Sequence, residues 1–319
     1  MAKDSERPLV SVLMLTYNHG AYLRQAIESV LAQRTDFRFE LVIADDCSTD
    51  DARNIATEFA QSHPDIVVPI IQDRNVGWRN NFNAAFGRCR GQLIACLEGD
   101  DYWTRIDKLQ MQADYLRTHP ECSLSFTRVR KVDDASGAIT GILPAIPVRP
   151  VSSIGDIIAA QFVQTCSVMF RKNAYAGGMP AWFEGLRLGD WPTWILIARH
   201  GNLGFLDVET AAYRVHQGGL WSGTDPVTMC KEVIRMLTRL ERHVGRKYRR
   251  LVRAAISREY FELSWLLRDQ GKHSFAKQAI GRCVTLKPVN RQLPLARVYA
   301  MWARYHAAPV YRAGKAFLG

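Results

Sequence analysis

Short apolar runs alternate with helical segments along residues 9–97, and this alternation limits the possible folds more than any other feature. The apolar runs cover residues 9–15, 40–44, 66–71 and 93–97. Between them, apolar residues recur every three or four positions, which is the period of a helix. Runs that are apolar on both faces suit strands of a parallel sheet covered by helices on both sides. The pattern therefore predicts an α/β domain.

Positive charge is concentrated at the end of the chain. The formal net charge is +11, yet up to Asp225 there are 22 Lys and Arg against 26 Asp and Glu. From Pro226 onward there are 20 against 5, a net charge of +15. We therefore expect a boundary near residues 223–226, which separates a domain over 1–225 from a basic domain over 226–319. Apolar spacing in the second part predicts three or four amphipathic helices.

The sequence contains no apolar run near the ~20 residues that span a bilayer, and no apolar signal-peptide segment at its start. We therefore expect a cytoplasmic protein. Basic amphipathic helices can lie on anionic membranes. Peripheral contact with the inner face of the cytoplasmic membrane is one hypothesis for residues 226–319, and a solvated basic face is the other. The seven scattered cysteines form no CxxC pair, which predicts reduced thiols rather than disulfides or structural zinc.

Acidic residues follow two of the predicted strands. Asp45, Asp46 and Asp50 come after the second strand, whereas Glu98, Asp100 and Asp101 come after the fourth. Ligands of open α/β sheets bind beyond the carboxyl ends of the strands. Carboxylates gathered there repel each other unless a cation lies between them, and hard oxygen ligands suit Mg²⁺ or Mn²⁺. A helix-capping role is the alternative, and it stays open for Asp50 in particular.

The alternation weakens after Val132. Residues 141–150 contain three prolines and predict a loop, whereas residues 165–170 predict a strand. Asp190 stands directly before Trp191 and Pro192, a position that suits either a helix N-cap or a catalytic carboxylate.

Several motifs together resemble the family 2 nucleotide-sugar glycosyltransferases of the GT-A fold, over roughly residues 8–222. In order, the motifs are residues 10–18 (VSVLMLTYN), 42–50 (VIADDCSTD), 75–77 (NVG), 97–103 (LEGDDYW), 189–191 (GDW) and 213–216 (YRVH). The resemblance implies a Rossmann-like, mostly parallel central sheet with helices on both faces, followed by the C-terminal helical region. It also implies a nucleotide-binding half over about 8–130 and an acceptor half over about 131–225.

The resemblance further implies roles for individual residues. The implied nucleotide-binding set is Thr16, Tyr17, Asn18, Asp45, Asp46, Asn75, Gly77, Glu98 and Asp100. The implied metal ligands are Asp101, Asp100 and His216, which would hold Mn²⁺ or Mg²⁺ against the diphosphate of the donor. Asp190 is the implied general base. On the acceptor side we place Trp103, Gln164, Thr165 and Trp191. Core packing is the alternative for the two tryptophans, and a solvent-facing strand position is the alternative for Gln164 and Thr165.

The sequence departs from the family pattern at three positions. Glu98 replaces the usual first Asp of the acidic motif, and Cys47 replaces the commoner Gly before Ser48. Gly189 replaces the usual acid before Asp190, which leaves Asp190 as the one candidate base in that motif.

We therefore predict a metal-dependent inverting glycosyltransferase. It would move a sugar from a nucleoside-diphosphate sugar to a saccharide or lipid-linked saccharide acceptor, in bacterial cell-surface polysaccharide or glycoconjugate synthesis. One alternative is a nucleotidyltransferase, although residues 15–20 lack the cationic glycine-rich loop expected there. The other is a non-catalytic protein whose basic helices bind membrane or nucleic acid. Nucleic acid is the weaker partner, because these helices lack the aromatic-rich sheet motif of common RNA modules.

Overall fold

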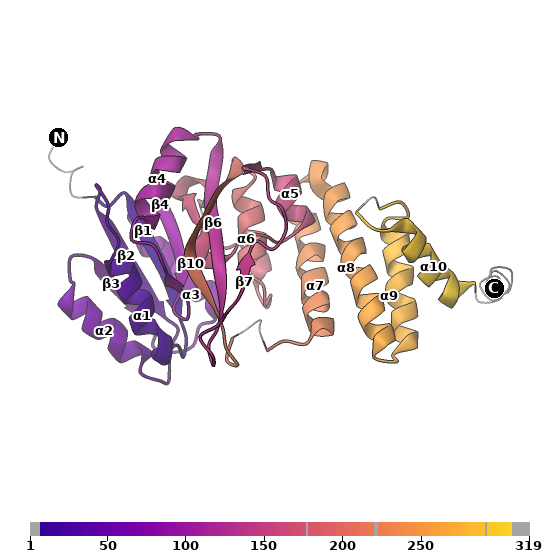
Figure 1. The fold of residues 1–319 in the computed structure, drawn as a ribbon, viewed down its shortest axis with the longest axis horizontal. Helices are drawn as coiled ribbons and strands as arrows, with labels where there is room; N and C mark the ends of the chain where they lie inside the picture. Colours follow the sequence, from indigo (N-terminus) through magenta and orange to yellow (C-terminus); the bar gives the residue numbers. More distant parts are fainter. Residues whose placement is uncertain (1–6, 177, 220–222, 291, 308–319) are drawn as a thin grey trace. The chain divides into compact units, whose positions relative to one another are not determined.

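The computed structural model describes residues 7–176, 178–219, 223–290 and 292–307, and these fall into two compact units (Figure 1). The first unit contains most of the chain before residue 218. The second unit contains residues 158–160 and 185–188 and the residues from 218 onward.

A ten-stranded mixed sheet forms the centre of the first unit. Its main path has the order β3-β2-β1-β4-β9-β6-β10-β5, while β7 pairs with β6 and β8 pairs with β10. The strands are β1 (Val10–Thr16), β2 (Phe39–Asp45), β3 (Val67–Ile71), β4 (Leu93–Glu98), β5 (Tyr102–Trp103), β6 (Cys122–Asp133), β7 (Ile139–Leu143), β8 (Val151–Ser152), β9 (Met169–Arg171) and β10 (Asn202–Val215).

Helices separate the strands along the chain, as the alternation predicts. Before residue 218 they are α1 (Gly20–Leu31), α2 (Ala52–Ser62), α3 (Trp78–Arg88), α4 (Lys108–Thr118), α5 (Ile154–Ala159) and α6 (Asp190–Ile197), with the 3₁₀ turns η1 (Thr165–Ser167), η2 (Lys172–Tyr175) and η3 (Ala181–Phe183). Helix α3 packs against β1 and β2, α2 against β3, and α4 against β6. Nearly every residue of β1 and β2 is buried, which confirms that helices cover both faces of this part of the sheet.

The parallel part of the sheet contains a reversal of strand order beside β1. β1 pairs in parallel with β2 on one side and with β4 on the other. In this register Thr16 lies opposite Asp45, and Leu15 lies opposite Glu98. The carboxyl ends of all three strands therefore meet at one edge. Such a reversal opens the crevice in which α/β proteins bind their ligands.

Two sequence-based predictions after residue 132 need correction. Residues 165–167 form η1 rather than a strand, because the Ser167 hydroxyl donates to the Gln164 carbonyl at 2.6 Å and competes with sheet pairing. Only Met169–Arg171 pairs, antiparallel to β4 and β6. The predicted loop over 141–150 begins as strand, because β7 extends to Leu143 and pairs with β6.

Four helices form the described part of the second unit: α7 (Pro226–His243), α8 (Arg249–Asp269), α9 (His273–Leu286) and α10 (Leu295–His306). Asp225 caps α7 by accepting the backbone N–H groups of Val227 and Thr228. Each helix packs on the next along the chain. This confirms the helical region predicted for this part of the chain.

Among the described helices, none has both the length and the apolarity that a bilayer crossing requires. The proposed peripheral contact with an anionic membrane stays a prediction. All seven cysteines are free thiols, as predicted.

Lys108 is fully buried at the start of α4. Its ammonium group donates to Gln112 and to the Ser167 carbonyl, and it lies 4.8 Å from the centroid of the Trp103 ring. Burial disfavours the charged amine and lowers the pKa of Lys108 from 10.5 to about 7.

This burial predicts a pH-dependent stability. Between about pH 7 and 10 the unfolded chain binds one more proton at Lys108 than the folded chain, so stability rises with pH, by up to about 1.4 kcal/mol per pH unit. Lys108→Met should therefore raise the melting temperature more at pH 6 than at pH 9. The exposed Lys277→Met serves as the control and should show no such trend. An equal effect of Lys108→Met at both pH values would contradict the prediction.

Candidate active site

The loops after β1 and β2 are tied together by Asn18. The Asn18 backbone N–H donates to the Ser48 hydroxyl at 2.9 Å, and the Asn18 side-chain oxygen accepts the Thr49 N–H at 2.8 Å. Asn18 has a φ of 56°, a left-handed conformation that asparagine tolerates better than most residues. Asp45 is fully buried and accepts the N–H and hydroxyl of Ser48. The carboxylate of Asp45 therefore shapes this loop.

Cys47 and Asp50 complete this loop. Cys47 has a φ of 62°, a conformation that glycine adopts without strain, and this explains why Gly is the commoner residue at this position in the family pattern. Asp50 accepts the backbone N–H groups of Gly20 at 2.7 Å and Ala52 at 3.0 Å. Asp50 thus accepts an N–H group at the start of both α1 and α2, as a capping carboxylate would, although the N-cap residue of α2 itself is Asp51.

Asp46 connects the same loop to the segment before α3. Its Oδ1 accepts the Val76 N–H at 2.7 Å, and burial raises the pKa of this carboxyl group. Gly77 has a φ of 81° and stands at the N-cap of α3. The side chain of Asn75 accepts the Gly77 N–H at 3.2 Å. The predicted nucleotide-binding residues thus gather at the carboxyl edge, where Tyr17 is 45% exposed.

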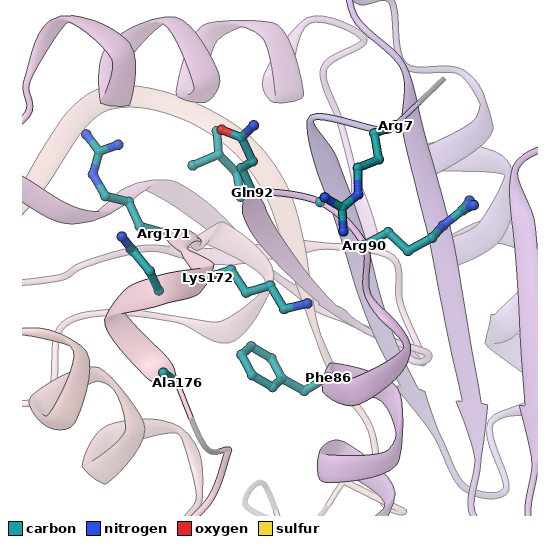
Figure 2. A pocket seen from close by; sticks show the side chains of 10 residues that line it. Arg7, Phe86, Arg90, Gln92, Arg171, Lys172 and Ala176 are labelled. Atoms are coloured by element: carbon teal, nitrogen blue, oxygen red, sulfur yellow. The ribbon is translucent and has the colours of Figure 1, made fainter. Parts of the chain in front are cut away.

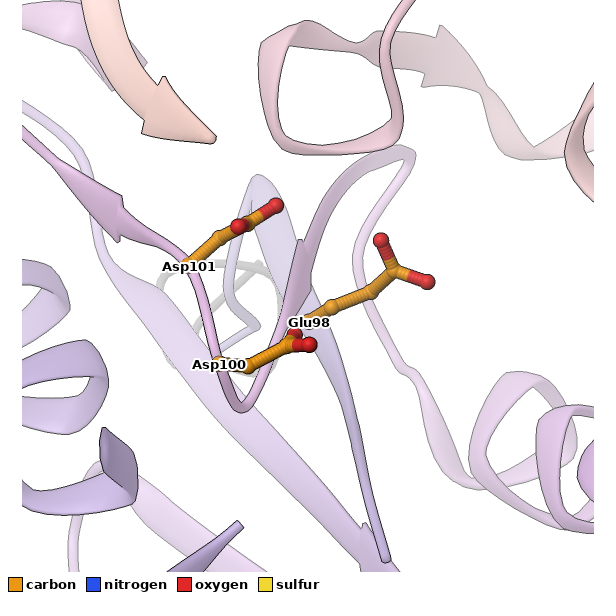
Figure 3. A group of neighbouring side chains, drawn as sticks. All are labelled: Glu98, Asp100 and Asp101. Atoms are coloured by element: carbon orange, nitrogen blue, oxygen red, sulfur yellow. The ribbon is translucent and has the colours of Figure 1, made fainter. Parts of the chain in front are cut away.

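Glu98, Asp100 and Asp101 project from the turn that joins β4 to β5 (Figure 3). Each offers a carboxylate oxygen, and these three oxygens lie within 4.8 Å of one another. Asp101 is 1% exposed, and its Oδ1 accepts the Arg214 backbone N–H at 2.9 Å. Its Oδ2 is buried without a hydrogen-bond partner among the described residues.

The three acids differ in their electrostatic environment. Burial, and then the neighbouring charge of Asp100, raise the pKa values of Glu98 and Asp101 well above their usual range. Burial opposes ionisation of Asp100 too, but the His216 hydrogen bond and the charge of His19 outweigh it and lower the pKa of Asp100. The cluster therefore holds one readily ionised carboxylate beside two that need an added positive charge.

A divalent cation fits this cluster. A buried carboxylate oxygen without a partner is costly, and a cation coordinated by Asp101 Oδ2 would remove that cost. Three carboxylates supply the hard oxygen ligands that Mg²⁺ and Mn²⁺ prefer. His216 lies beside this cluster, with its Nε2 3.1 Å from Asp100 Oδ2, and its role as a direct ligand stays a prediction.

Three further residues lie near the acids: His19 and Gly99, to which the sequence gave no site role, and Arg214 of the YRVH motif, for which it allowed either a positive charge near the diphosphate or a surface ion pair. His19 is the residue after Asn18, and its Nε2 lies 3.6 Å from Asp100 Oδ2. Arg214 donates from its Nε to the Asp100 carbonyl at 2.8 Å. A Cβ at Gly99 would lie 2.9 Å from the Thr16 hydroxyl and 3.1 Å from His19 Nδ1. The one sequence signal was that Gly99 lies inside the acidic motif and His19 follows the first strand.

Asp190 is the first residue of α6, and its N-cap is Gly189. The Asp190 Oδ2 accepts the Gln161 side-chain N–H at 2.8 Å. Burial raises the pKa of Asp190, and hydrogen bonds from Trp191 and Gln161 partly offset this effect. The charge of Asp190 is also among the causes that raise the pKa of Glu98. The structure therefore brings the expected base close to the acidic cluster.

Two predicted acceptor contacts need correction. Trp103 is 4% exposed in the core, and its indole N–H donates to the Cys166 carbonyl at 3.0 Å. Trp191 is 3% exposed, and its indole N–H donates to the Ile157 carbonyl at 2.6 Å. Neither ring presents a face to a bound sugar, because both are packed inside the unit. Gln164 and Thr165 are half-buried at η1.

The Trp78 ring fills the space beside Gly189, the position at which the family pattern has a second acid. A Cβ at Gly189 would lie 2.2 Å from the Trp78 ring, much closer than real contacts allow. Trp78 is half-buried and lies 6.4 Å from the Phe183 ring, between centroids. The position of the Trp78 ring therefore accounts for the absence of an acidic side chain at position 189.

The sheet with its strand-order reversal and the acid cluster at that reversal agree with the expected GT-A-like domain. "Glycosyl transferase family 2" matches residues 11–177, a little more than half of the chain. The chain therefore belongs to this family.

Two sequence relatives are similar to part of this chain, and one of them is named as a glycosyltransferase. An uncharacterised protein of Mycobacterium bovis is 35% identical over 212 residues, which are 66% of this chain and 60% of the relative. The chain thus matches less than two thirds of that relative's length. The putative teichuronic acid biosynthesis glycosyltransferase TuaG of Bacillus subtilis is 36% identical over 121 residues, 38% of this chain and 46% of TuaG.

Solved structures share the fold at low sequence identity. S. aureus TarS 1–349, in complex with UDP-GlcNAc, has a TM-score of 0.67 at 18% identity and covers 96% of this chain and 92% of its own. The mannosyltransferase PcManGT from Pyrobaculum calidifontis, in complex with GDP-Man and Mn²⁺, has a TM-score of 0.61 at 17% identity, with coverages of 96% and 83%. These similarities confirm the GT-A fold.

The close approach of Trp78 and Gly189 predicts a measurable coupling. Gly189→Ala should lower the free energy of unfolding by about 1–3 kcal/mol, because the added methyl group meets a rigid ring. Combining it with Trp78→Ala should remove most of that cost. Urea unfolding of the two single variants and the double variant measures this coupling. Gly141→Ala is the control, since its Cβ meets nothing within 4 Å. Wild-type stability of Gly189→Ala would contradict the prediction.

Proposed function

We propose that this protein transfers a sugar from a nucleoside-diphosphate sugar to an acceptor hydroxyl, with inversion and with a divalent cation. The observation that carries the proposal is the convergence of the Glu98, Asp100 and Asp101 carboxylates beside Asp190 at the strand-order reversal. Mn²⁺ or Mg²⁺ held there would supply a Lewis acid that stabilises charge on the departing diphosphate.

The protein's own residues organise the donor side. We propose that Asp101 and Asp100 hold the cation, with Glu98 close enough to share it. His216 and His19 flank the Asp100 carboxylate and keep it ionised. We propose that the loops that carry Asn18, Asp46 and Asn75 bind the nucleoside. Hydrogen bonds hold the backbones of these loops in position before the donor binds.

Asp190 acts as the general base in this proposal. The acceptor oxygen attacks the anomeric carbon opposite the diphosphate, the bond to the diphosphate breaks, and the hydroxyl proton passes to the Asp190 carboxylate. One such displacement inverts the anomeric centre. Gln161 orients Asp190 through the bond to its Oδ2, and burial raises its pKa, which improves it as a proton acceptor.

The acceptor side is assigned to Trp78, Gln164 and Thr165. Trp78 is half-buried beside the residue that precedes Asp190, whereas Trp103 and Trp191 are packed in the core. An aromatic face suits a saccharide ring, so we propose a saccharide or lipid-linked saccharide acceptor. The name of the relative TuaG supports a place in bacterial cell-surface polysaccharide synthesis.

The donor is proposed to be a uridine or guanosine diphosphate sugar. The two structurally similar proteins were solved with UDP-GlcNAc and with GDP-Man. The family assignment favours this activity over nucleotidyl transfer and over nucleic-acid binding.

Nucleotide-dependent stabilisation tests the donor site. UDP or GDP at about 100 times its dissociation constant should stabilise the protein by about 2.7 kcal/mol when Mn²⁺ is present, with a much smaller shift in EDTA. Asp101→Asn should lose the Mn²⁺-dependent part, whereas the exposed Asp36→Asn should keep it. Thermal melting measures both. If neither nucleotide stabilises the wild-type protein in Mn²⁺, the proposed activity is wrong.

Replacing the base tests the chemical step. Asp190→Asn should lower kcat by about 10²–10⁴-fold, because the asparagine amide cannot take the proton from the attacking hydroxyl group. Its Mn²⁺-dependent stabilisation by nucleotide should match that of the wild-type protein. Release of nucleoside diphosphate from UDP-GlcNAc or GDP-Man, with water as acceptor, measures turnover. Wild-type turnover by Asp190→Asn would assign the base elsewhere.

A further inference from the structure

A hollow lies at the end of the sheet where β4 begins, opposite the end that carries the acids. Its volume is about 570 Å³, and its charged lining consists of Arg7, Arg90, Arg171 and Lys172 (Figure 2). Leu93 also lines it and is the first residue of β4, whereas Glu98 is the last. At ~3.3 Å per strand residue, the two sites are about 16 Å apart along β4.

Three of these cations have no acidic partner. Arg90 donates to Glu40 Oε2 at 2.7 Å and is thereby compensated. Arg171 instead donates to backbone carbonyls, at 2.6 Å to Leu116 and 2.9 Å to Cys122. Lys172 donates to the Cys89 carbonyl. Among the described residues, Arg7, Arg171 and Lys172 form no ion pair with a carboxylate.

Carbonyl partners have a different effect from carboxylate partners. They hold the Arg171 and Lys172 side chains in position but leave their charges in place. Figure 2 shows the ends of Arg7 and Lys172 directed toward the same space above the Phe86 ring. The Arg171 guanidinium is directed away from that space, toward the carbonyls that it binds, so it lines the hollow without converging on Arg7 and Lys172. The like charges of Arg7 and Lys172 repel each other, and a bound anion would convert that repulsion into attraction.

The other lining residues favour a phosphate-bearing ligand. Among the described residues none that lines the hollow is acidic, and Gln92 and Asn173 add amide donors to the cations. Charge-assisted bonds from Arg and Lys are the usual means of binding phosphate oxygens. A volume of about 570 Å³ exceeds the needs of one phosphate and is within the range of sites for small organic ligands.

We propose that this hollow, formed by Arg7, Phe86, Arg90, Arg171 and Lys172, binds a phosphate or diphosphate group separately from the catalytic site. The group can belong to a soluble phosphate compound or to the headgroup of an anionic lipid. The site is independent of the proposed donor site, because it uses none of the same residues.

Calorimetric titration with pyrophosphate tests the soluble form. EDTA is included so that the catalytic acids hold no cation. The wild-type protein should bind, and Arg7→Gln combined with Lys172→Gln should weaken binding by about tenfold or more, since two charge-assisted contacts are lost. Arg7→Gln alone should weaken it less, and this change is at an exposed residue at the edge of the first unit. Arg199→Gln, an exposed arginine outside the hollow, is the matched control.

Co-sedimentation with vesicles tests the lipid form. Vesicles of phosphatidylcholine with phosphatidylglycerol are compared with phosphatidylcholine alone, using the same variants. Loss of binding in the double variant in either assay, with Arg199→Gln and Asp101→Asn unchanged, supports the site and identifies the source of the phosphate. Undiminished binding by the double variant in both assays, or no wild-type binding in either, overturns the proposal. Neither result depends on turnover, so a failure here is distinguishable from a failure of the proposed activity.

Discussion

Electrostatic repulsion among carboxylates at one edge of the sheet is the constraint on which the site depends. β4 ends in a turn that places Glu98, Asp100 and Asp101 within reach of one another, and two of them have strongly raised pKa values. A fold bears such a cost only when another part of the structure offsets it. Here His19 and His216 offset it at Asp100, and a cation would offset it at Asp101.

Long-range contacts hold this turn in place. Arg214, on β10, donates its backbone N–H to Asp101 and its side-chain Nε to the Asp100 carbonyl. Gly99 lets the turn approach Thr16 and His19, because any side chain there would collide with them. The acidic motif is therefore positioned by residues about eighty positions before it and more than a hundred positions after it. Local sequence alone could not have fixed its geometry.

The departures from the family pattern have physical reasons. Cys47 takes a backbone conformation that suits glycine, so this site carries local strain. Gly189 is glycine because the Trp78 ring occupies the space of its Cβ. The departure at Cys47 is therefore a strained turn, and the departure at Gly189 makes room for the Trp78 ring. The second replaces a charge near Asp190 with an aromatic surface.

The sequence determined the α/β class, which predicted strands carry acids at their carboxyl ends, and the helical end of the chain, because apolar periodicity and strand-end acids are local signals. It also placed Asp45, Asp46, Glu98, Asp100 and Asp101 at one edge, since parallel strands align their carboxyl ends. Only the tertiary structure decided that Trp103 and Trp191 are buried, that His19 joins His216 at Asp100, and that Arg7, Arg171 and Lys172 share a hollow. These features depend on which side chains meet across distant elements, and burial and pairing of that kind leave no periodic trace along the chain.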